Sequence, residues 1–283
     1  MATQSPFDAK SDVELLEASR AGDRGALEAL LLRHQARVYR FGMQMCRDPE
    51  DARDILQETL LAMARGVREF RGASSISTWL YSVARSFCIK KHRKSKFAPE
   101  ASQFESVDAA DLTDVADRTQ LAPDDALAGK EVEQALESAI RALDPTYREV
   151  LLLRDVEGLT APEVAEVLGV SVQAVKTRLH RARVAVRARV APALGSPVDA
   201  PNPVSTCPDV LTLFSQHLED EIRPEVCIEM ERHLDQCERC RNACDSLKQT
   251  LALCHASGPA TVVPSHVQDA VHRALRDFLK EHP

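Results

Sequence analysis

The fold of this chain is decided by Thr160-Ala-Pro-Glu-Val-Ala-Glu-Val-Leu-Gly-Val-Ser-Val-Gln-Ala-Val-Lys-Thr-Arg-Leu-His-Arg-Ala-Arg183. Thr160 and Glu163 have the spacing of a capping box, in which each side chain satisfies a free amide of the first helical turn. Gly169 suits the left-handed backbone that ends a helix, and Ser171 suits the cap of the next one. The stretch therefore predicts two helices joined by a tight turn.

The second helix of this pair has the character of a helix that reads DNA. Val172, Val175 and Leu179 recur at helical spacing, so we expect them to pack inward and the polar side chains to face a major groove. Six Lys or Arg and no acid lie between Lys176 and Arg189, which favours phosphate contact over a merely solvated face. The predicted DNA contacts of this helix are Ser171, Gln173, Ala174, Lys176, Thr177, Arg178, Arg181 and Arg183.

Residues 155–183 closely resemble the promoter −35 reading region of bacterial sigma factors of the extracytoplasmic-function (ECF) type. The spacing of the residues alone indicates DNA, and the resemblance adds the promoter. A second segment agrees, because Asp48-Pro-Glu-Asp-Ala-Arg-Asp-Ile-Leu-Gln-Glu-Thr-Leu-Leu-Ala62 resembles the part of these factors that grips the RNA polymerase core. The resemblance implies that Asp54, Gln57 and Glu58 face the polymerase and that Ile55, Leu56 and Leu60 pack inward. Without it, the acids would be interpreted as a solvated helix face.

A third segment, Phe70-Arg-Gly-Ala-Ser-Ser-Ile-Ser-Thr-Trp-Leu-Tyr-Ser-Val-Ala-Arg85, resembles the loop and helix with which the family opens promoters at the −10 element. A base removed from the stack needs a polar pocket, and the nearby backbone needs cations. We expect Trp79, spaced helically with Val83, to pack in the core and not to stack on a base. The predicted DNA contacts here are Arg71, Ser74, Ser75, Arg85, Lys90, Lys91 and Arg93.

Charge and composition divide the chain into segments. The net charge of −7 combines +5 over residues 1–97, −8 over 98–143, +2 over 144–190 and −6 thereafter, and local charge is what meets phosphate. Aromatic residues make up only 4%, which is typical of small helical units. No run approaches the roughly 20 apolar residues that span a bilayer, and residues 1–10 lack the apolar centre of a signal peptide. We therefore expect a cytoplasmic protein with reduced thiols and no membrane contact.

The predicted fold class is all-α, with two helical sigma modules, of the promoter −10 and helix-turn-helix −35 types, joined by an acidic linker and followed by a small helical Cys-rich metal-binding domain. The linkers are inferred from an acidic stretch without an apolar stripe and from a Pro-rich stretch. The expected boundaries are 11–97 for the polymerase and −10 module, 98–129 for the acidic linker, 130–191 for the −35 module, 192–206 for the Pro-rich linker and 207–283 for the Cys-rich domain.

Six of the eight cysteines lie between residues 207 and 254. Isolated cysteines usually serve packing, which is our interpretation of Cys46, Cys88 and Cys254. In contrast, His233, Cys237, Cys240 and Cys244 would form one stripe on an unbroken helix, and thiolates with an imidazole suit Zn(II), Cd(II) or Cu(I). The candidate metal ligands are Cys207, Cys227, His233, Cys237, Cys240 and Cys244.

This segment also resembles the zinc-binding domain of anti-sigma factors, whose four ligand places are occupied by Cys207, His233, Cys237 and Cys240. The extra cysteines at 227 and 244 resemble the CorE-like group of metal-responsive sigma factors. The resemblances imply a non-enzymatic promoter factor that binds polymerase core and promoter DNA, with a contact between its tail and its sigma modules. Control by Zn(II) or Cd(II) is expected first and by copper second, and a disulfide switch is the alternative. An enzyme is not expected, because no H-E-x-x-H pattern is present.

Overall fold

The computed structural model describes residues 6–46, 48–70, 72, 74–97, 123–196, 207–258 and 262–281, and in these ranges it is helical with no strand. The predicted all-α class is confirmed. No described helix has the length and apolar character needed to cross a lipid bilayer. The expected linkers fall largely on residues outside the described ranges, although helix α5 begins at Pro123, inside the range expected to be linker.

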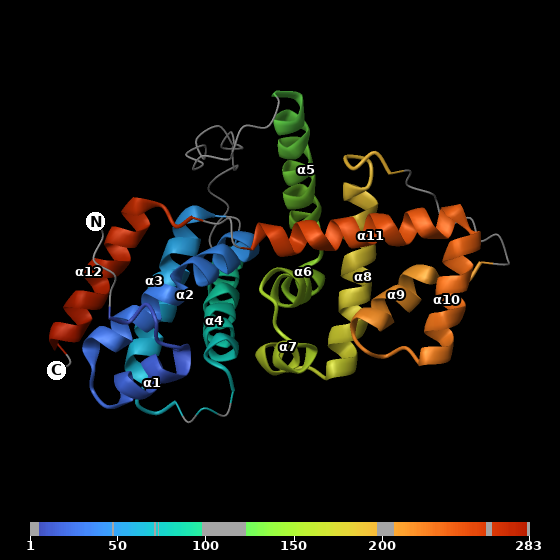
Figure 1. Ribbon diagram of the computed structural model, residues 1–283. Helices are drawn as coiled ribbons and strands as arrows, with labels where there is room; N and C mark the ends of the chain where they lie inside the picture. Colours follow the sequence, from blue (N-terminus) through green and yellow to red (C-terminus); the bar gives the residue numbers. More distant parts are fainter. Residues whose placement is uncertain are drawn as a thin grey trace.

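The first module packs four helices around an apolar core (Figure 1). Asp48 caps the third of them, since its carboxylate accepts a hydrogen bond from the amide of Asp51 at 2.9 Å. Ile55, Leu56 and Leu60 are buried as predicted. Trp79 is half-buried against Phe70 in an edge-to-face contact, as expected of a core residue. The helices are α1 (Asp12–Arg20), α2 (Arg24–Cys46), α3 (Pro49–Gly66) and α4 (Ile76–Phe97).

The second module contains the predicted pair of helices and turn. Both hydrogen bonds of the Thr160–Glu163 capping box are present, Gly169 has a φ of 66°, and Ser171 caps the second helix. One expectation was wrong: Val172 is exposed, because the buried stripe begins one turn later with Val175 and Leu179. The elements are α5 (Pro123–Arg141), α6 (Pro145–Leu151), a π-helical turn (Leu152–Val156), α7 (Ala161–Leu168) and α8 (Val172–Val190).

The third module reaches both of the others (Figure 1). Its first three helices enclose a small core of their own that includes Phe214, Met230 and Leu247. The long helix α11 then packs against α8, the π-helical turn and α5, and the last helix packs against α3 of the first module. The helices are α9 (Val210–Leu218), α10 (Pro224–Gln236), α11 (Glu238–Ser257) and α12 (Ser265–Glu281).

Candidate metal centre and nucleic-acid interface

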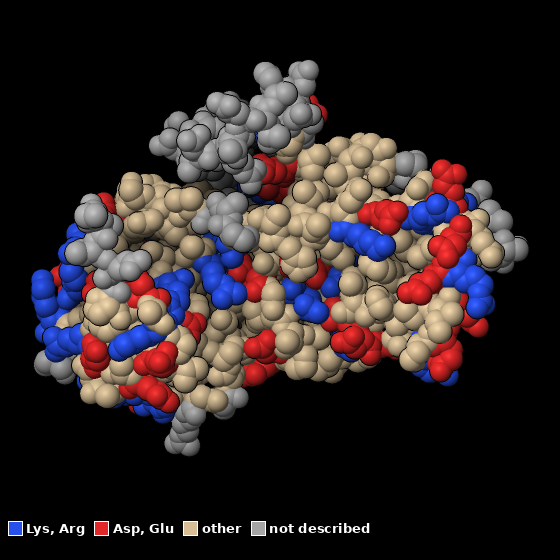
Figure 2. All heavy atoms as spheres, in the orientation of Figure 1, with Lys and Arg blue, Asp and Glu red and all other residues tan. Residues whose placement is uncertain are grey.

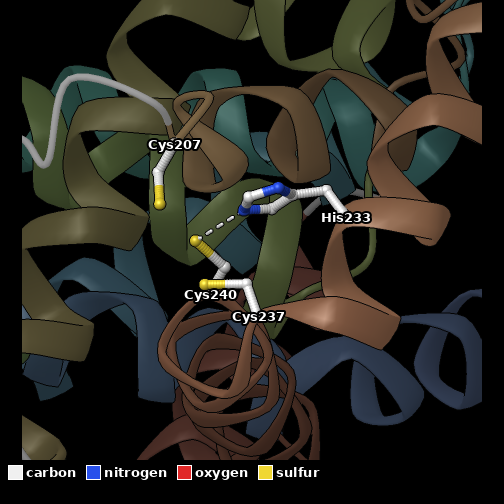
Figure 3. Close-up of side chains that lie close together, drawn as sticks. All are labelled: Cys207, His233, Cys237 and Cys240. Atoms are coloured by element: carbon white, nitrogen blue, oxygen red, sulfur yellow. Dashed lines mark hydrogen bonds between the residues drawn. The ribbon is translucent and has the colours of Figure 1, made fainter.

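Four soft or borderline metal ligands converge at the corner between α10 and α11 (Figure 3). The ligand atoms of Cys207, His233, Cys237 and Cys240 all lie within 4.8 Å of one another. The Nε2 atom of His233 is 3.2 Å from Sγ of Cys240. Three thiols and one imidazole are a usual donor set for a closed tetrahedral zinc site. The arrangement is therefore suited to a structural ion of this kind.

A break in the helix creates this convergence. Helix α10 ends at Gln236 and α11 starts at Glu238, while Cys237 between them has the extended backbone angles φ −120° and ψ 98°. The guanidinium of Arg241 donates to the carbonyl oxygens of Leu234 and Asp235, both at 3.1 Å, and so satisfies the end of α10. His233 at the end of one helix thus faces Cys240 in the first turn of the next.

Two of the predicted ligands, Cys227 and Cys244, lie outside this cluster, so the structure brings together four of the six residues. Cys244 lies one turn beyond Cys240 and points into the core of the third module, where it is 0% exposed with its Sγ 3.9 Å from the carbonyl oxygen of Val210. Cys227 lies on α10 and contacts His217 and Glu231 instead of the four-residue cluster. Cys254 is buried, as expected.

The thiols of Cys237 and Cys240 differ in how readily they ionise. Hydrogen bonds from the backbone and the side chain of Cys240 lower the pKa of the Cys237 thiol. Burial, with hydrogen bonds to Cys237 and Cys207, raises the pKa of the Cys240 thiol to about 12. The half-buried thiol of Cys237 therefore ionises before that of Cys240, and a cation is required to hold Cys240 as a thiolate.

Two cysteines one turn apart give a matched pair of variants for this centre. We expect Cys240→Ser to weaken zinc binding by about 100-fold, since about 12 kcal/mol shared among four ligands is about 3 kcal/mol for each. Cys244→Ala should keep the affinity and lose about 1–2 kcal/mol of unfolding free energy as a core change. Competition with a chromophoric chelator and urea unfolding measure the two quantities. Equal loss of zinc affinity in both variants would contradict the assignment.

The third module covers part of the helix predicted to read DNA. The ammonium of Lys176 is 3.0 Å from a carboxylate oxygen of Glu221, and His180 Nε2 is 3.1 Å from the hydroxyl oxygen of Thr212. Arg183 was predicted to contact DNA, but its side chain is only 2% exposed. The predicted contacts left exposed on α8 are Ser171, Gln173, Thr177 and Arg181, while Ala174 and Arg178 are half-buried.

The burial of Arg183 has a clear physical cause. Its guanidinium donates to both carboxylate oxygens of Asp155, at 2.7 and 2.9 Å, and to Glu219 at 2.9 Å and the Ser215 hydroxyl at 3.3 Å. Glu219 also accepts from Arg154 at 3.2 Å. A guanidinium that pairs with two carboxylates is stabilised in the interior. Arg183 is therefore buried, although its spacing in the sequence places it on a basic face of the helix.

The first and second modules also contact each other directly. Glu157, at 6% exposure, accepts hydrogen bonds from Arg40 at 2.6 and 2.7 Å and from the Tyr81 hydroxyl at 2.6 Å. Burial and the charge of Glu157 raise the pKa of Tyr81. Arg85, predicted to contact the −10 element, pairs with Glu149 at 2.8 Å. Arg183 of the predicted −35 contacts and Arg85 of the predicted −10 contacts are therefore both paired with acids of this chain.

The remaining predicted residues of the first module that the structure describes are half-buried or exposed. Asp54 pairs with Lys91 at 2.8 Å, and with Gln57, Glu58, Phe87 and Lys90 these two residues line a hollow of about 610 Å³. Ser75 caps α4 through the amide of Thr78 at 3.1 Å, and Ser74 is half-buried beside it. Arg71 and the side chain of Arg93 lie outside the described residues. On the face shown in Figure 2, acidic and basic side chains of the described residues are interspersed along the molecule.

Sequence reasoning missed Asp155, which pairs with Arg183 within the second module, and four acids that pair with residues of another module: Glu149, Glu157, Glu219 and Glu221. Their partners lie tens of residues away along the chain, so no local spacing marks them. The one available signal was the presence of two acids, Asp155 and Glu157, directly before a helix-turn-helix whose second helix is basic.

Comparison with known families matches each module separately. Residues 30–97 match the family described as sigma-70 region 2, residues 133–186 match sigma-70, region 4, and residues 207–241 match a family described as "Putative zinc-finger". The ECF RNA polymerase sigma factor SigM of Mycobacterium tuberculosis (strain ATCC 25618 / H37Rv) is 34% identical over 186 residues, covering 66% of this chain and 86% of that protein. RNA polymerase sigma-H factor of Pseudomonas aeruginosa is 29% identical, covering 65% and 96%.

Two solved structures match about the same share of this chain as these relatives do. CnrH in complex with the cytosolic domain of CnrY matches with 23% identity over 63% of this chain and 96% of that chain, at a TM-score of 0.45. The sigma factor RpoE in complex with the anti-sigma factor NepR from Bartonella quintana matches with 20% identity over 60% and 96%, at a TM-score of 0.42.

Proposed function

The chain belongs to the ECF sigma factors of RNA polymerase, and from this premise we propose that its third module is a built-in inhibitor whose bound metal decides whether the promoter-reading helix is covered. Members of this family bind the polymerase core and direct it to promoters, so the chain is a transcription regulator and not an enzyme. The first module contributes two surfaces to that task and the second module contributes one.

The surfaces for polymerase and promoter follow from the placement of side chains. We assign the −35 element to α8, with Gln173, Thr177 and Arg181 facing solvent at its first turns. The exposed Lys90 and the ion-paired Arg85 and Lys91 on α4 serve the −10 element. The polymerase core takes the surface of Asp54, Gln57 and Glu58 on α3.

One observation carries the inhibitory role: carboxylates of the third module occupy the cations of α8. Glu219 pairs with Arg183 and Glu221 pairs with Lys176. DNA phosphate and a carboxylate compete for the same cation. The contact between the modules is intramolecular, because both belong to one chain, and this favours the carboxylate. Promoter DNA therefore has to displace the third module before it reaches the whole of α8.

Metal binding at the Cys207, His233, Cys237 and Cys240 cluster controls whether this contact with α8 forms. An ion there would tie Cys207, just before α9, to the corner of α10 and α11, and would so fix α9, which is followed by the loop that carries Glu219 and Glu221. A structural zinc ion contributes on the order of 10 kcal/mol, whereas about 5.5 kcal/mol reverses a two-state equilibrium from 1:99 to 99:1. Three thiolates favour Zn(II) or Cd(II), and copper is the next candidate.

Thiol redox chemistry is a second candidate for the switch, because the sulfur atoms of Cys207, Cys237 and Cys240 lie within 4.8 Å of one another. A disulfide between two of them would remove two ligands and release the corner. Mass spectrometry separates the candidates, since the metal route adds an ion and the redox route removes two hydrogens.

Transcription with purified polymerase core tests the proposal. We expect the output of the intact chain to change at least about tenfold between metal-free buffer and one of zinc, cadmium or copper, because a coupling of only about 1.4 kcal/mol suffices for that change. Cys240→Ser should abolish the response, and Cys244→Ala, the matched control, should retain it. Output that no metal changes would refute metal control, and a response to peroxide alone would favour the redox candidate.

A further inference from the structure

The contact between the promoter-reading helix and the third module includes a histidine. Helix α9 packs against α8 (Figure 1), and His180 of α8 contacts Thr212 of α9. We propose that His180 makes this contact sensitive to protons, so that uptake of one proton from water at its Nδ1 atom releases the third module from α8. The inference rests on the proposed function, because it adds a second input to the same covering contact.

Hydrogen bonds around Thr212 fix which nitrogen of the His180 ring carries the hydrogen. The Thr212 hydroxyl donates its single hydrogen to Oδ2 of Asp209 at 2.7 Å, since an ionised carboxylate only accepts. The Thr212 oxygen is therefore the acceptor in its 3.1 Å contact with Nε2 of His180. The ring is thus neutral, with its hydrogen on Nε2 and a bare lone pair on Nδ1.

The other ring nitrogen of His180 is buried. Nδ1 is shielded from solvent and has no hydrogen-bond partner among the described residues. A proton at this atom would create a buried N–H group without an acceptor and a buried positive charge. Both cost free energy in the covered state, because neither is compensated by a partner as it would be in water.

Burial and nearby charges together set the pKa of the His180 ring. Burial lowers this pKa and is the largest effect. The carboxylate of Asp209, just before α9, raises the pKa, and the guanidiniums of Arg183 and Arg181 on α8 lower it. These are the charged groups of the described residues that act on the ring. The net result is a pKa below the ordinary histidine value, so the covered state keeps the ring neutral.

The direction of the pH effect follows from comparing the covered and released states. When α9 leaves α8, water reaches the His180 ring and its pKa returns toward about 6.5, so the released state binds the proton more readily. The contact keeps its full strength above this pH, where the ring is neutral in both states. As the pH falls below it, release is favoured by up to about tenfold for each pH unit, until the covered ring also titrates.

NMR of the intact, reduced and zinc-loaded chain with ¹⁵N-labelled histidine tests the protonation state of the ring. We expect His180 to be neutral with its hydrogen on Nε2 at about pH 7.5, and its pKa to lie below that of His266, an exposed residue of α12. The spectrum of His180→Gln assigns the ring by the signal that it lacks. A His180 hydrogen on Nδ1, or a His180 pKa at or above that of His266, overturns the inference.

Release itself is measured as the affinity of the intact chain for a short duplex of random sequence at low salt, because phosphate needs the same cations of α8. From about pH 7.5 to about pH 5.5, the wild-type affinity should rise about five- to tenfold more than that of His180→Gln. His266→Gln, the matched control, should follow the wild type. Acid also weakens zinc binding, but all three chains keep the metal cluster, so this effect cancels in the comparison. Equal pH dependence in the wild type and His180→Gln refutes the inference.

Glu219→Arg separates release from a direct contact of the charged ring with DNA. This variant places a third positive charge between Arg183 and Arg154 and breaks the covering contact without touching His180. Adding His180→Gln to Glu219→Arg should then leave the pH dependence of DNA affinity unchanged. If the double variant has a weaker pH dependence than Glu219→Arg alone, the proton acts on DNA binding itself and the inference fails.

These outcomes are separable from those of the proposed function. If a metal changes transcription while the wild type and His180→Gln share one pH dependence, the proton input fails and metal control stands. If His180 gives the expected pH effect while no metal changes transcription, metal control fails and the proton input stands.

Discussion

Glu219→Arg is expected to raise the affinity of the intact chain for promoter DNA by about 100-fold, since separating a buried ion pair costs about 3–5 kcal/mol and each 1.4 kcal/mol is about tenfold. The Glu219 side chain is 5% exposed and lies between Arg183, at 2.9 Å, and Arg154, at 3.2 Å. A third positive charge at this place repels both guanidiniums and detaches the loop after α9. Lys176 and the rest of α8 then become available to phosphate.

Fluorescence anisotropy with a duplex measures this effect. The duplex is selected from a random pool by the chain ending at Ser196, because that chain retains all helices of the first two modules. Glu229→Arg makes the same charge change on an exposed position of α10 and serves as the control for nonspecific attraction to DNA. If both variants bind the duplex with the same affinity, the gain in affinity comes from net charge alone and the inhibitory contact is refuted.

Glu157→Gln should open the contact between the first two modules. The side chain of Glu157 is 2% exposed and is the shared acceptor for Arg40, Arg37 and the Tyr81 hydroxyl. Loss of its charge leaves two guanidiniums facing a neutral amide, which we expect to cost the closed arrangement about 3–5 kcal/mol. The expected result is a separation of the two modules.

Small-angle X-ray scattering reports this separation as an increase in radius of gyration, and circular dichroism checks that the helices remain. Glu166→Gln removes one acid from an exposed position of α7 and should leave the scattering unchanged. An unchanged radius of gyration for Glu157→Gln, with wild-type helicity, would show that this network does not hold the modules together.

Local signals predicted the elements of the fold well. The capping box at Thr160, the left-handed Gly169 and the cap at Ser171 all depend on neighbours within four residues, so they can be predicted from the local sequence. The same holds for the buried stripe of α3. The four residues that follow a family pattern do converge, while their binding of a metal stays a prediction. These predictions required no knowledge of how modules meet.

The predictions that failed depended on distant partners or on a local break. Arg183 sits on a basic face by spacing, but Asp155 and Glu219 meet it from other elements and bury it. Cys244 shares a helical stripe with Cys240, but the extended backbone at Cys237 turns His233 toward one cysteine and leaves the other in the core. Long-range pairing and the end of a helix are set by tertiary structure, which spacing does not contain.

The central claim is that the third module covers the helix that reads the promoter. Its most direct test is the equilibrium affinity for the selected duplex, measured for the intact chain and for the chain ending at Ser196 with one equivalent of zinc in reducing buffer. We predict that the intact chain binds at least about 100-fold more weakly, in line with the cost of displacing the Glu219 contact. Equal affinities would contradict the claim.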